Sequence, residues 1–171
     1  MEKEELPRNT AYLRFCSVEL CKFFNNLGLP FGKKINFELS PTVLSERSLR
    51  IALLRGLMDT DGSLCKRGNR LALVFTSYDN YLLNLVESFG KEFDIFTHKN
   101  SSQVGTDSWP KICKYFQIIG SSNHRHVICF LAKLKCNKMI YKSETAKFKN
   151  LSTGLVLPYR ADGLVVRAET L

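Results

Sequence analysis

An apolar stretch that ends in two closely spaced carboxylates constrains this chain more than any other feature of its sequence. Residues 53–63 read LLRGLMDTDGS, so Asp59 and Asp61 stand directly before Gly62. The C-terminus of a helix carries a partial negative charge, and acidic side chains there are locally unfavourable. Hard divalent cations prefer carboxylate oxygens as ligands. The pattern therefore predicts a helix that delivers acids at its tip, with metal binding as the first candidate for their purpose.

Small residues recur at every fourth position of the same stretch and so share one face of the predicted helix. They are Ser48, Ala52, Gly56 and Thr60. A ridge of small side chains lets a second helix approach with its backbone close, as it does in pairs of membrane helices. The arginines at positions 47, 50 and 55 exclude a membrane span here. The ridge predicts a helix–helix interface.

The nonapeptide Leu54–Gly62 (LRGLMDTDG) resembles the signature of the LAGLIDADG homing endonucleases. Arg55 and Thr60 depart from the alanines that are usual in the signature, at helix positions that tolerate the change. The resemblance implies an α+β fold with an αββαββα core, in which helices cover one face of an antiparallel, saddle-shaped sheet. It also implies a homodimer, because family members with a single motif pair through their signature helices. Pairing with a different chain is the alternative.

Hydrophobic periodicity and turn residues predict the same order of elements. The predicted elements are a short helix over 17–27, the signature helix from an N-cap at Ser45 to about Met58, a hairpin of strands 63–66 and 70–77, a helix from Asp79 or Asn80 to Phe89, stopped by Gly90, strands 93–98 and 111–120, a third helix from Ser122 or Asn123, and a partly helical basic segment over 135–150. We divide the chain into an N-terminal extension (1–44), an endonuclease core (45–150) and a C-terminal tail (151–171).

The positive charge of the chain is concentrated in its last third. Residues 1–110 contain 14 Lys and Arg against 13 Asp and Glu, whereas residues 111–171 contain 11 against 3. This asymmetry favours a polyanionic partner, most simply nucleic acid. No apolar run has the length of a transmembrane helix, and the N-terminus has no signal-peptide core. We therefore expect an intracellular protein, cytoplasmic or organellar, without a membrane partner.

The resemblance assigns the essential acid of the family to Asp61. It implies Mg²⁺ as cofactor, held by Asp61 of each subunit and by the backbone carbonyl of Thr60, and hydrolysis of a phosphodiester as the reaction. Asp59 either assists this metal or ties the helix end to nearby backbone, and we expect the second role. The family pocket also holds a basic residue from beyond the third helix. Lys142 is the first candidate and Lys138 the second, although both can instead contact the DNA backbone.

The uncovered face of an antiparallel sheet fits the major groove of DNA, where base edges present distinguishable donors and acceptors. We expect contacts with double-stranded DNA from residues on the predicted strands and hairpin tips, namely Lys66, Arg67, Arg70, Thr76, Lys99, Ser101, Gln103, Lys111, Tyr115 and Gln117. Each of these alone also fits an ordinary exposed strand residue.

The sequence therefore predicts a metal-dependent, site-specific double-strand DNA endonuclease that acts as a symmetric dimer and is encoded in an intron or intein. The alternative is a non-cleaving nucleic-acid-binding protein on the same scaffold, either an RNA-splicing maturase or a transcription regulator. The aspartate at position 61 favours the first, because a degenerate site more often carries Asn or Ser there.

Overall fold

The computed structural model describes residues 17–29 and 38–151. The chain divides into two compact units, Met1–Ser45 and Glu46–Leu171. Among the described residues, no helix is long and apolar enough to cross a membrane.

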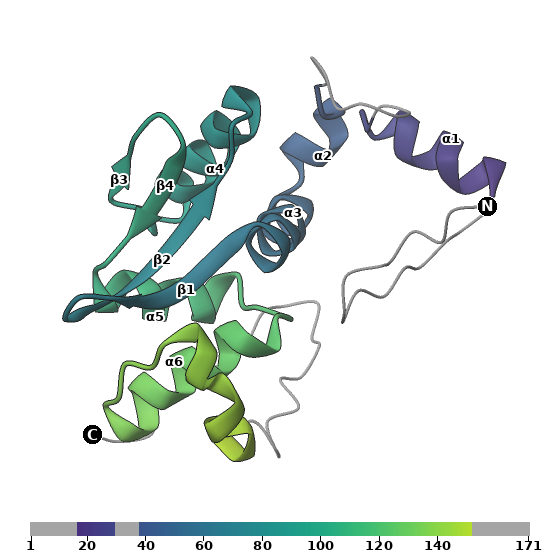
Figure 1. The fold of residues 1–171 in the computed structure, drawn as a ribbon. Coiled ribbons are helices and arrows are strands. Elements are labelled where there is room, and N and C mark those ends of the chain that lie inside the picture. Colours follow the sequence, from purple (N-terminus) through teal and green to yellow (C-terminus); the bar gives the residue numbers. More distant parts are fainter. Residues whose placement is uncertain (1–16, 30–37, 152–171) are drawn as a thin grey trace, which may run out of the picture. The chain divides into compact units, whose positions relative to one another are not determined.

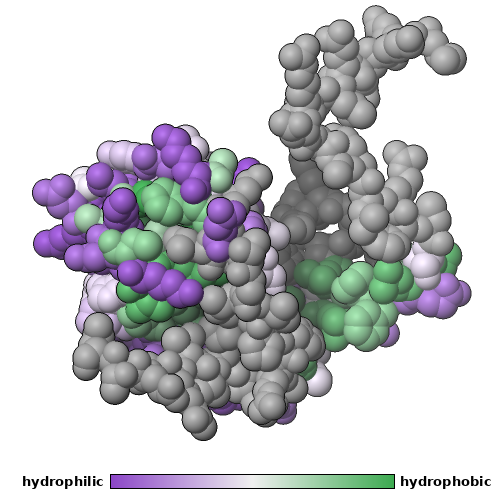
Figure 2. All heavy atoms as spheres, turned by 90° about the horizontal axis from the view of Figure 1, so that it is seen from below, coloured by the Kyte–Doolittle hydropathy of each residue, from purple (hydrophilic) through white to green (hydrophobic). Residues whose placement is uncertain are grey.

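The first unit contains the helices α1 (Val18–Asn26) and α2 (Pro41–Ser45). The prediction of a helix over 17–27 is confirmed, because the Ser17 hydroxyl caps α1 by accepting a hydrogen bond from the backbone N–H of Leu20 at 3.2 Å. Gly28 follows with a φ of +91°, and a Cβ there would lie 2.1 Å from the carbonyl oxygen of Glu38. Four apolar residues of α1 are exposed, namely Val18, Leu20, Phe23 and Phe24. Helix α1 contributes to the green surface at the right of Figure 2.

The signature helix is α3 (Arg47–Thr60), which buries Leu54 and Met58. The predicted N-cap at Ser45 is wrong, because Ser45 is the last residue of α2. Glu46 occupies the N-cap position of α3 without a capping hydrogen bond from its side chain. The helix also continues past Met58, where we predicted its end, and ends at Thr60.

An antiparallel sheet of four strands follows, in the spatial order β1-β2-β4-β3 (Figure 1). Its strands are β1 (Gly62–Arg67), β2 (Arg70–Thr76), β3 (His98–Lys99) and β4 (Gln103–Thr106). The predicted hairpin is confirmed: Gly62 pairs with Phe75 at one end, and Arg67 pairs with Arg70 at the tip. The two ends of β1 therefore differ, since one joins the acidic motif and the other carries cations.

Helices α4 (Asn80–Glu92) and α5 (Trp109–Ile118) pack against the sheet, α6 (His124–Cys136) contacts β1, and the 3₁₀ helix η1 (Lys142–Leu151) follows and contacts α6. Helices α4 and α5 contact β2, and Figure 1 shows α4 behind the sheet. Leu73, Phe75 and Val104 point to this side and are fully buried. The structure thus confirms an α+β fold with an antiparallel sheet.

Two predicted strands are wrong. Residues 93–97 do not form a strand, because Phe93 caps the C-terminus of α4 and Asp94 takes a φ of +52°, and β3 begins only at His98. Residues 111–120 lie mostly in α5. Its buried residues Ile112, Tyr115 and Phe116 are three and four positions apart, which is a helical spacing that we misread as a strand.

Gly90 does not stop α4 as predicted, because the helix continues to Glu92. The reason for a glycine here is packing. A Cβ at this position would lie 2.3 Å from the ring of Phe96, so only glycine lets the segment after the helix fold back against it.

Candidate active site and nucleic-acid surface

Asp61 stands at the junction between α3 and β1. It is the C-cap residue of α3, and its backbone N–H donates to the carbonyl of Leu57 at 3.0 Å. Its side chain is exposed, and within the described part of the chain no hydrogen bond or ion pair engages its carboxylate. The helix therefore presents an unengaged carboxylate at its tip, as the sequence predicted for this motif.

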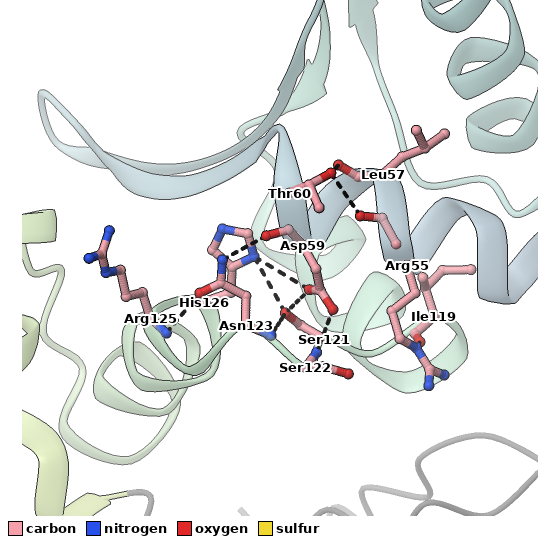
Figure 3. Close-up of polar contacts among 11 residues, drawn as sticks. Arg55, Leu57, Asp59, Thr60, Ile119, Ser121, Ser122, Asn123, Arg125 and His126 are labelled. Carbon is pink, nitrogen blue, oxygen red and sulfur yellow. Dashed lines mark hydrogen bonds and ion pairs between the residues drawn. The ribbon is translucent and has the colours of Figure 1, made fainter. Parts of the chain in front are cut away.

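Asp59, two residues earlier, points into the protein and is fully engaged (Figure 3). Its carboxylate accepts hydrogen bonds from the hydroxyl of Ser121 at 2.5 Å and from the backbone N–H of Ser122 at 2.7 Å. Its backbone carbonyl accepts another from the side-chain amide of Asn123 at 2.8 Å. These contacts tie the end of α3 to the start of α6, which is the second of the two roles considered for Asp59.

His126 completes this cluster. It is 5% exposed, and its Nδ1 lies 3.4 Å from the Ser121 hydroxyl and 3.9 Å from the Asp59 carboxylate. Sequence reasoning missed Ser121, Asn123 and His126. The available signal was the polar run SSNHRH directly before an apolar helix, although it did not reveal which residue these side chains would meet.

A polar pocket of about 110 Å³ lies beside the motif. Thr60, Gly62 and Ser63 line it from the α3–β1 junction, and Asn123, Arg125 and His126 line it from α6. Arg125 is exposed and projects away from the Asp59 cluster in Figure 3. Within the described residues its guanidinium has no ion pair. A free cation therefore lines a pocket whose other wall contains both neighbours of Asp61.

A thiol also lines this pocket, and it does not suit a metal. Burial raises the pKa of Cys129 to about 11, with a smaller contribution from Cys65. Because metals bind the thiolate, Cys129 is a weak ligand at neutral pH.

The residues of the motif fit a hard cation. An exposed carboxylate on Asp61 and the helix-terminal carbonyl of Thr60 are oxygen donors, and carbonyls in the last turn of a helix lack intrahelical partners. No cluster of three or more His, Cys, Asp or Glu side chains suited to a metal occurs in the described ranges. Mg²⁺ is commonly held by one or two carboxylates together with water and substrate phosphates, so this small donor set is compatible with it.

The two predicted lysines lie beyond α6. Lys138 is exposed and follows the C-terminus of that helix, whereas the Asp59 cluster lies at its N-terminus. Since α6 contains 13 residues, these ends are about 20 Å apart. The structure therefore does not bring Lys138 to the motif. Lys142 begins η1, and its side chain lies outside the described residues.

Three of the ten predicted DNA contacts are exposed at the ends of strands, on the sheet face opposite Leu73 and Phe75, where Ala72 and Val74 are buried. The strand register puts Arg67, Arg70 and Thr76 on this face, together with the half-buried Gln103. Ser101 is exposed in the turn between β3 and β4. This face therefore offers cations at the hairpin tip and polar side chains near the motif.

Two lysines point to the other side of the sheet. The Lys66 ammonium lies 4.9 Å from the ring centre of Tyr141. The Lys99 ammonium donates to Asn84 at 2.6 Å and to Glu87 at 2.7 Å, both on α4. These contacts engage the two lysines within the protein.

The last three predicted contacts stand on α5 rather than on a strand. Tyr115 is fully buried, so the prediction that it contacts DNA is wrong. Its hydroxyl has no hydrogen-bond partner among the described residues, and burial raises its pKa. Lys111 forms an ion pair with Asp94, and Gln117 is exposed on the helix.

The ridge of small residues on α3 is uncovered within the second unit. Its four members, Ser48, Ala52, Gly56 and Thr60, are all exposed. A Cβ on Gly56 would meet no atom within 4 Å. Arg55 points elsewhere, since its Nε donates to the carbonyl of Ile119 at 2.6 Å. The helix is thus anchored away from the ridge.

Comparison with known proteins agrees with this geometry. A LAGLIDADG-like domain is recognised over residues 48–129, which include α3, the whole sheet and the first turns of α6. Neither the curated proteins nor the solved structures contain a match to the sequence. Residues 48–129 of this chain therefore form a domain of the LAGLIDADG family.

Proposed function

We propose that the protein is a site-specific double-strand DNA endonuclease that acts as a homodimer and requires Mg²⁺. The observation that carries this proposal is the contrast between the two acids of the motif. Asp59 is engaged by Ser121 and Ser122, whereas Asp61 is exposed at the helix tip without a partner in the described chain. A carboxylate kept free at a defined point is available for chemistry.

Asp61 and the backbone carbonyl of Thr60 are the residues that would hold Mg²⁺. When bound, such an ion supplies Lewis acidity toward a phosphate oxygen and lowers the pKa of water. The Asp61 carboxylate orients the attacking water, which gives up one proton as its oxygen bonds to phosphorus; the ester P–O bond breaks, and the leaving oxygen takes up one proton, so that none is gained or lost overall. Arg125, which lines the adjacent pocket, offers positive charge to the phosphate and is a stronger candidate for this role than Lys138.

A symmetric dimer follows from the exposed ridge. Packing of Ser48, Ala52, Gly56 and Thr60 against the same residues of a second copy buries a surface that is exposed within this unit. A two-fold axis makes such an interface self-complementary. Duplex DNA has its own local two-fold symmetry, so the dimer presents one Asp61 to each strand.

The test is cleavage of a randomised DNA library in the presence of Mg²⁺ by the wild-type chain and by Asp61→Asn. We expect discrete double-strand cuts by the wild type, their loss in Asp61→Asn, and binding by both. Asp94→Asn is the matched control. Asp94 is a second exposed aspartate, and its φ of +52° suits asparagine. The Asp94→Asn variant should still make the same double-strand cuts as the wild type.

Two results would contradict the endonuclease. One is DNA binding without cuts by the wild-type chain. The other is a preference for structured RNA over DNA. Either would favour the non-cleaving alternative, a maturase or a regulator on the same scaffold.

A further inference from the structure

Tyr78 is the most exposed large hydrophobic residue in the described ranges. The residue is 95% exposed, against 52% for Tyr141 and 64% for Val18. Tyr141 also has a partner, because the Lys66 ammonium lies over its ring. For Tyr78 the described residues supply neither a ring contact nor a hydrogen bond. The ring is therefore available to a partner.

The backbone on both sides of Tyr78 is fixed. The Ser77 N–H donates to the carbonyl of Ser102 at 3.0 Å, and the Asp79 N–H donates to the Ser77 hydroxyl at 3.0 Å. Asp79 in turn caps α4 by accepting from the N–H groups of Tyr81 and Leu82. The ring thus projects from a rigid connector, and binding it to a partner costs only the freedom of its own two torsions.

Tyr78 also lies at the motif end of the sheet. Gly62 on β1 pairs with Phe75 on β2. Asp61 directly precedes Gly62 in the chain, and Tyr78 comes three residues after Phe75. Asp61 and Tyr78 therefore lie at the same end of the antiparallel pair. Counting Cα–Cα steps of 3.8 Å and one strand crossing of about 5.5 Å, the Cα atoms of Asp61 and Tyr78 are no more than about 20 Å apart. The bases of one DNA strand are spaced by about 3.4 Å, so this distance covers about six base steps.

We propose that Tyr78 stacks on a base of bound DNA within about six base steps of the phosphate that Asp61 serves. This inference rests on the proposed function, because it takes DNA as the ligand and Asp61 as the cleavage centre. Every base has an aromatic face, so an exposed ring binds it without hydrogen bonds. Apolar and aromatic side chains that enter a DNA helix partly unstack a base step and kink it there. The face would then combine cations at the hairpin tip with a stacking ring near the acid.

The experiment measures binding of a mixed-sequence 30-base-pair duplex to the wild-type chain, Tyr78→Phe and Tyr78→Leu in buffer without magnesium. Phenylalanine keeps the ring, whereas leucine keeps apolar bulk without an aromatic face. We expect Tyr78→Phe to bind like the wild type and Tyr78→Leu to bind more weakly, by no more than the roughly 5- to 150-fold that alanine substitution of one stacking aromatic costs. Leu134→Ala is the control, because Leu134 is an exposed apolar residue on α6, and it should not change the affinity.

Three outcomes would overturn the proposal. Equal affinity of Tyr78→Leu and the wild type would remove any role of the ring. Equal weakening of Tyr78→Phe and Tyr78→Leu would assign the effect to the hydroxyl. A ring-dependent preference for structured RNA would replace DNA as the ligand. These readouts measure binding, so they test the role of Tyr78 even where the wild-type chain binds DNA without cutting it. A wild-type chain that cuts DNA while Tyr78→Leu binds normally would refute the stacking and leave the proposed function intact.

Discussion

At the residue scale, the motif divides its two aspartates between structure and solvent. A helix turns by about 100° per residue, so side chains two positions apart point in nearly opposite directions. Asp59 therefore meets Ser121 and Ser122 at the start of α6, while Asp61 leaves the helix on another side. The spacing of the acids thus lets one helix end be both anchored and chemically available.

Replacing Asp59 by alanine should destabilise the protein. Ser121 is buried, with 6% of the residue exposed. The change leaves its hydroxyl without the carboxylate that accepts its hydrogen bond. Hydrogen bonds to a charged group contribute about 1.5–3 kcal/mol each, and we expect a loss of about 3–6 kcal/mol because two are removed. Urea unfolding measures this loss. An unchanged midpoint would show that the tie between α3 and α6 contributes little.

At the element scale, α5 is held by charge as well as by its buried face. Asp94, just after α4, forms ion pairs with Lys111 and with Lys114 at 3.0 Å, both on α5. These two ammonium groups hold the pKa of the Asp94 carboxyl below its ordinary value of 3.8. These two ion pairs link the end of α4 to α5, and both helices contact β2.

Because the pKa of Asp94 is lowered in the folded protein, the free energy of unfolding depends on pH in a defined direction. A carboxyl whose pKa is lowered in the folded state contributes stability above its unfolded pKa and loses that contribution as pH falls through the folded pKa. We therefore expect the unfolding midpoint of the wild type to fall more steeply than that of Asp94→Asn below about pH 4. Urea unfolding at stepped pH values checks this, and parallel curves for the two proteins would contradict it.

The exposed ridge of α3 gives a second prediction at this scale. A Cβ added to Gly56 has no neighbour within 4 Å, so a larger side chain does not clash within the unit, and removing a helical glycine stabilises a helix by roughly 1 kcal/mol. We expect Gly56→Leu to fold but to sediment as a monomer, because its bulk separates the two helices. Gly56→Ala is the matched control and should remain a dimer.

Sedimentation velocity at micromolar concentration gives the readout. A wild-type monomer would refute the proposed homodimer directly. A dimer formed by Gly56→Leu would instead place the interface on another surface.

At the scale of the whole molecule, the net charge of +9 sets the strength of binding to any polyanion. Within the described residues, Arg67 at the hairpin tip and Arg125 beside the pocket are exposed cations without ion pairs. Cations that meet phosphates release counterions, so affinity falls with salt in proportion to the number of phosphates contacted.

Neutralising these arginines should therefore flatten the salt dependence of DNA binding. Arg67→Gln and Arg125→Gln should each reduce the slope of log affinity against log salt by about 0.9 per contact, or about 1.8 for a dimer. Lys91→Gln is the control, because the Lys91 ammonium already forms an ion pair with Glu87 on the same helix, α4. Fluorescence anisotropy between 50 and 200 mM salt, a range of about fourfold, resolves such changes. A slope equal to that of the wild type would remove the arginine concerned from the DNA interface.

The sequence by itself determined the local elements and the position of the acids. The motif predicted α3 and its acidic tip, the turn at residues 67–69 predicted the hairpin, and the pair Ser122 and Asn123 predicted the start of α6, which Asn123 caps. Each of these depends on neighbours within a few residues, through helix periodicity, a tight turn or an N-cap hydrogen bond. Such interactions join residues that are close in sequence, so they can be predicted without knowledge of the rest of the fold.

The tertiary structure alone decided which groups meet. Asp59 and Ser121 are 62 positions apart, and only the packing of α3 against the start of α6 joins them and leaves Arg125 beside the motif. The same holds for α5, whose apolar residues fit a strand until their burial shows a helical face, and for Tyr115, which became core rather than surface. Distant contacts depend on how elements pack, and the free energy of packing is shared among residues that no local pattern connects.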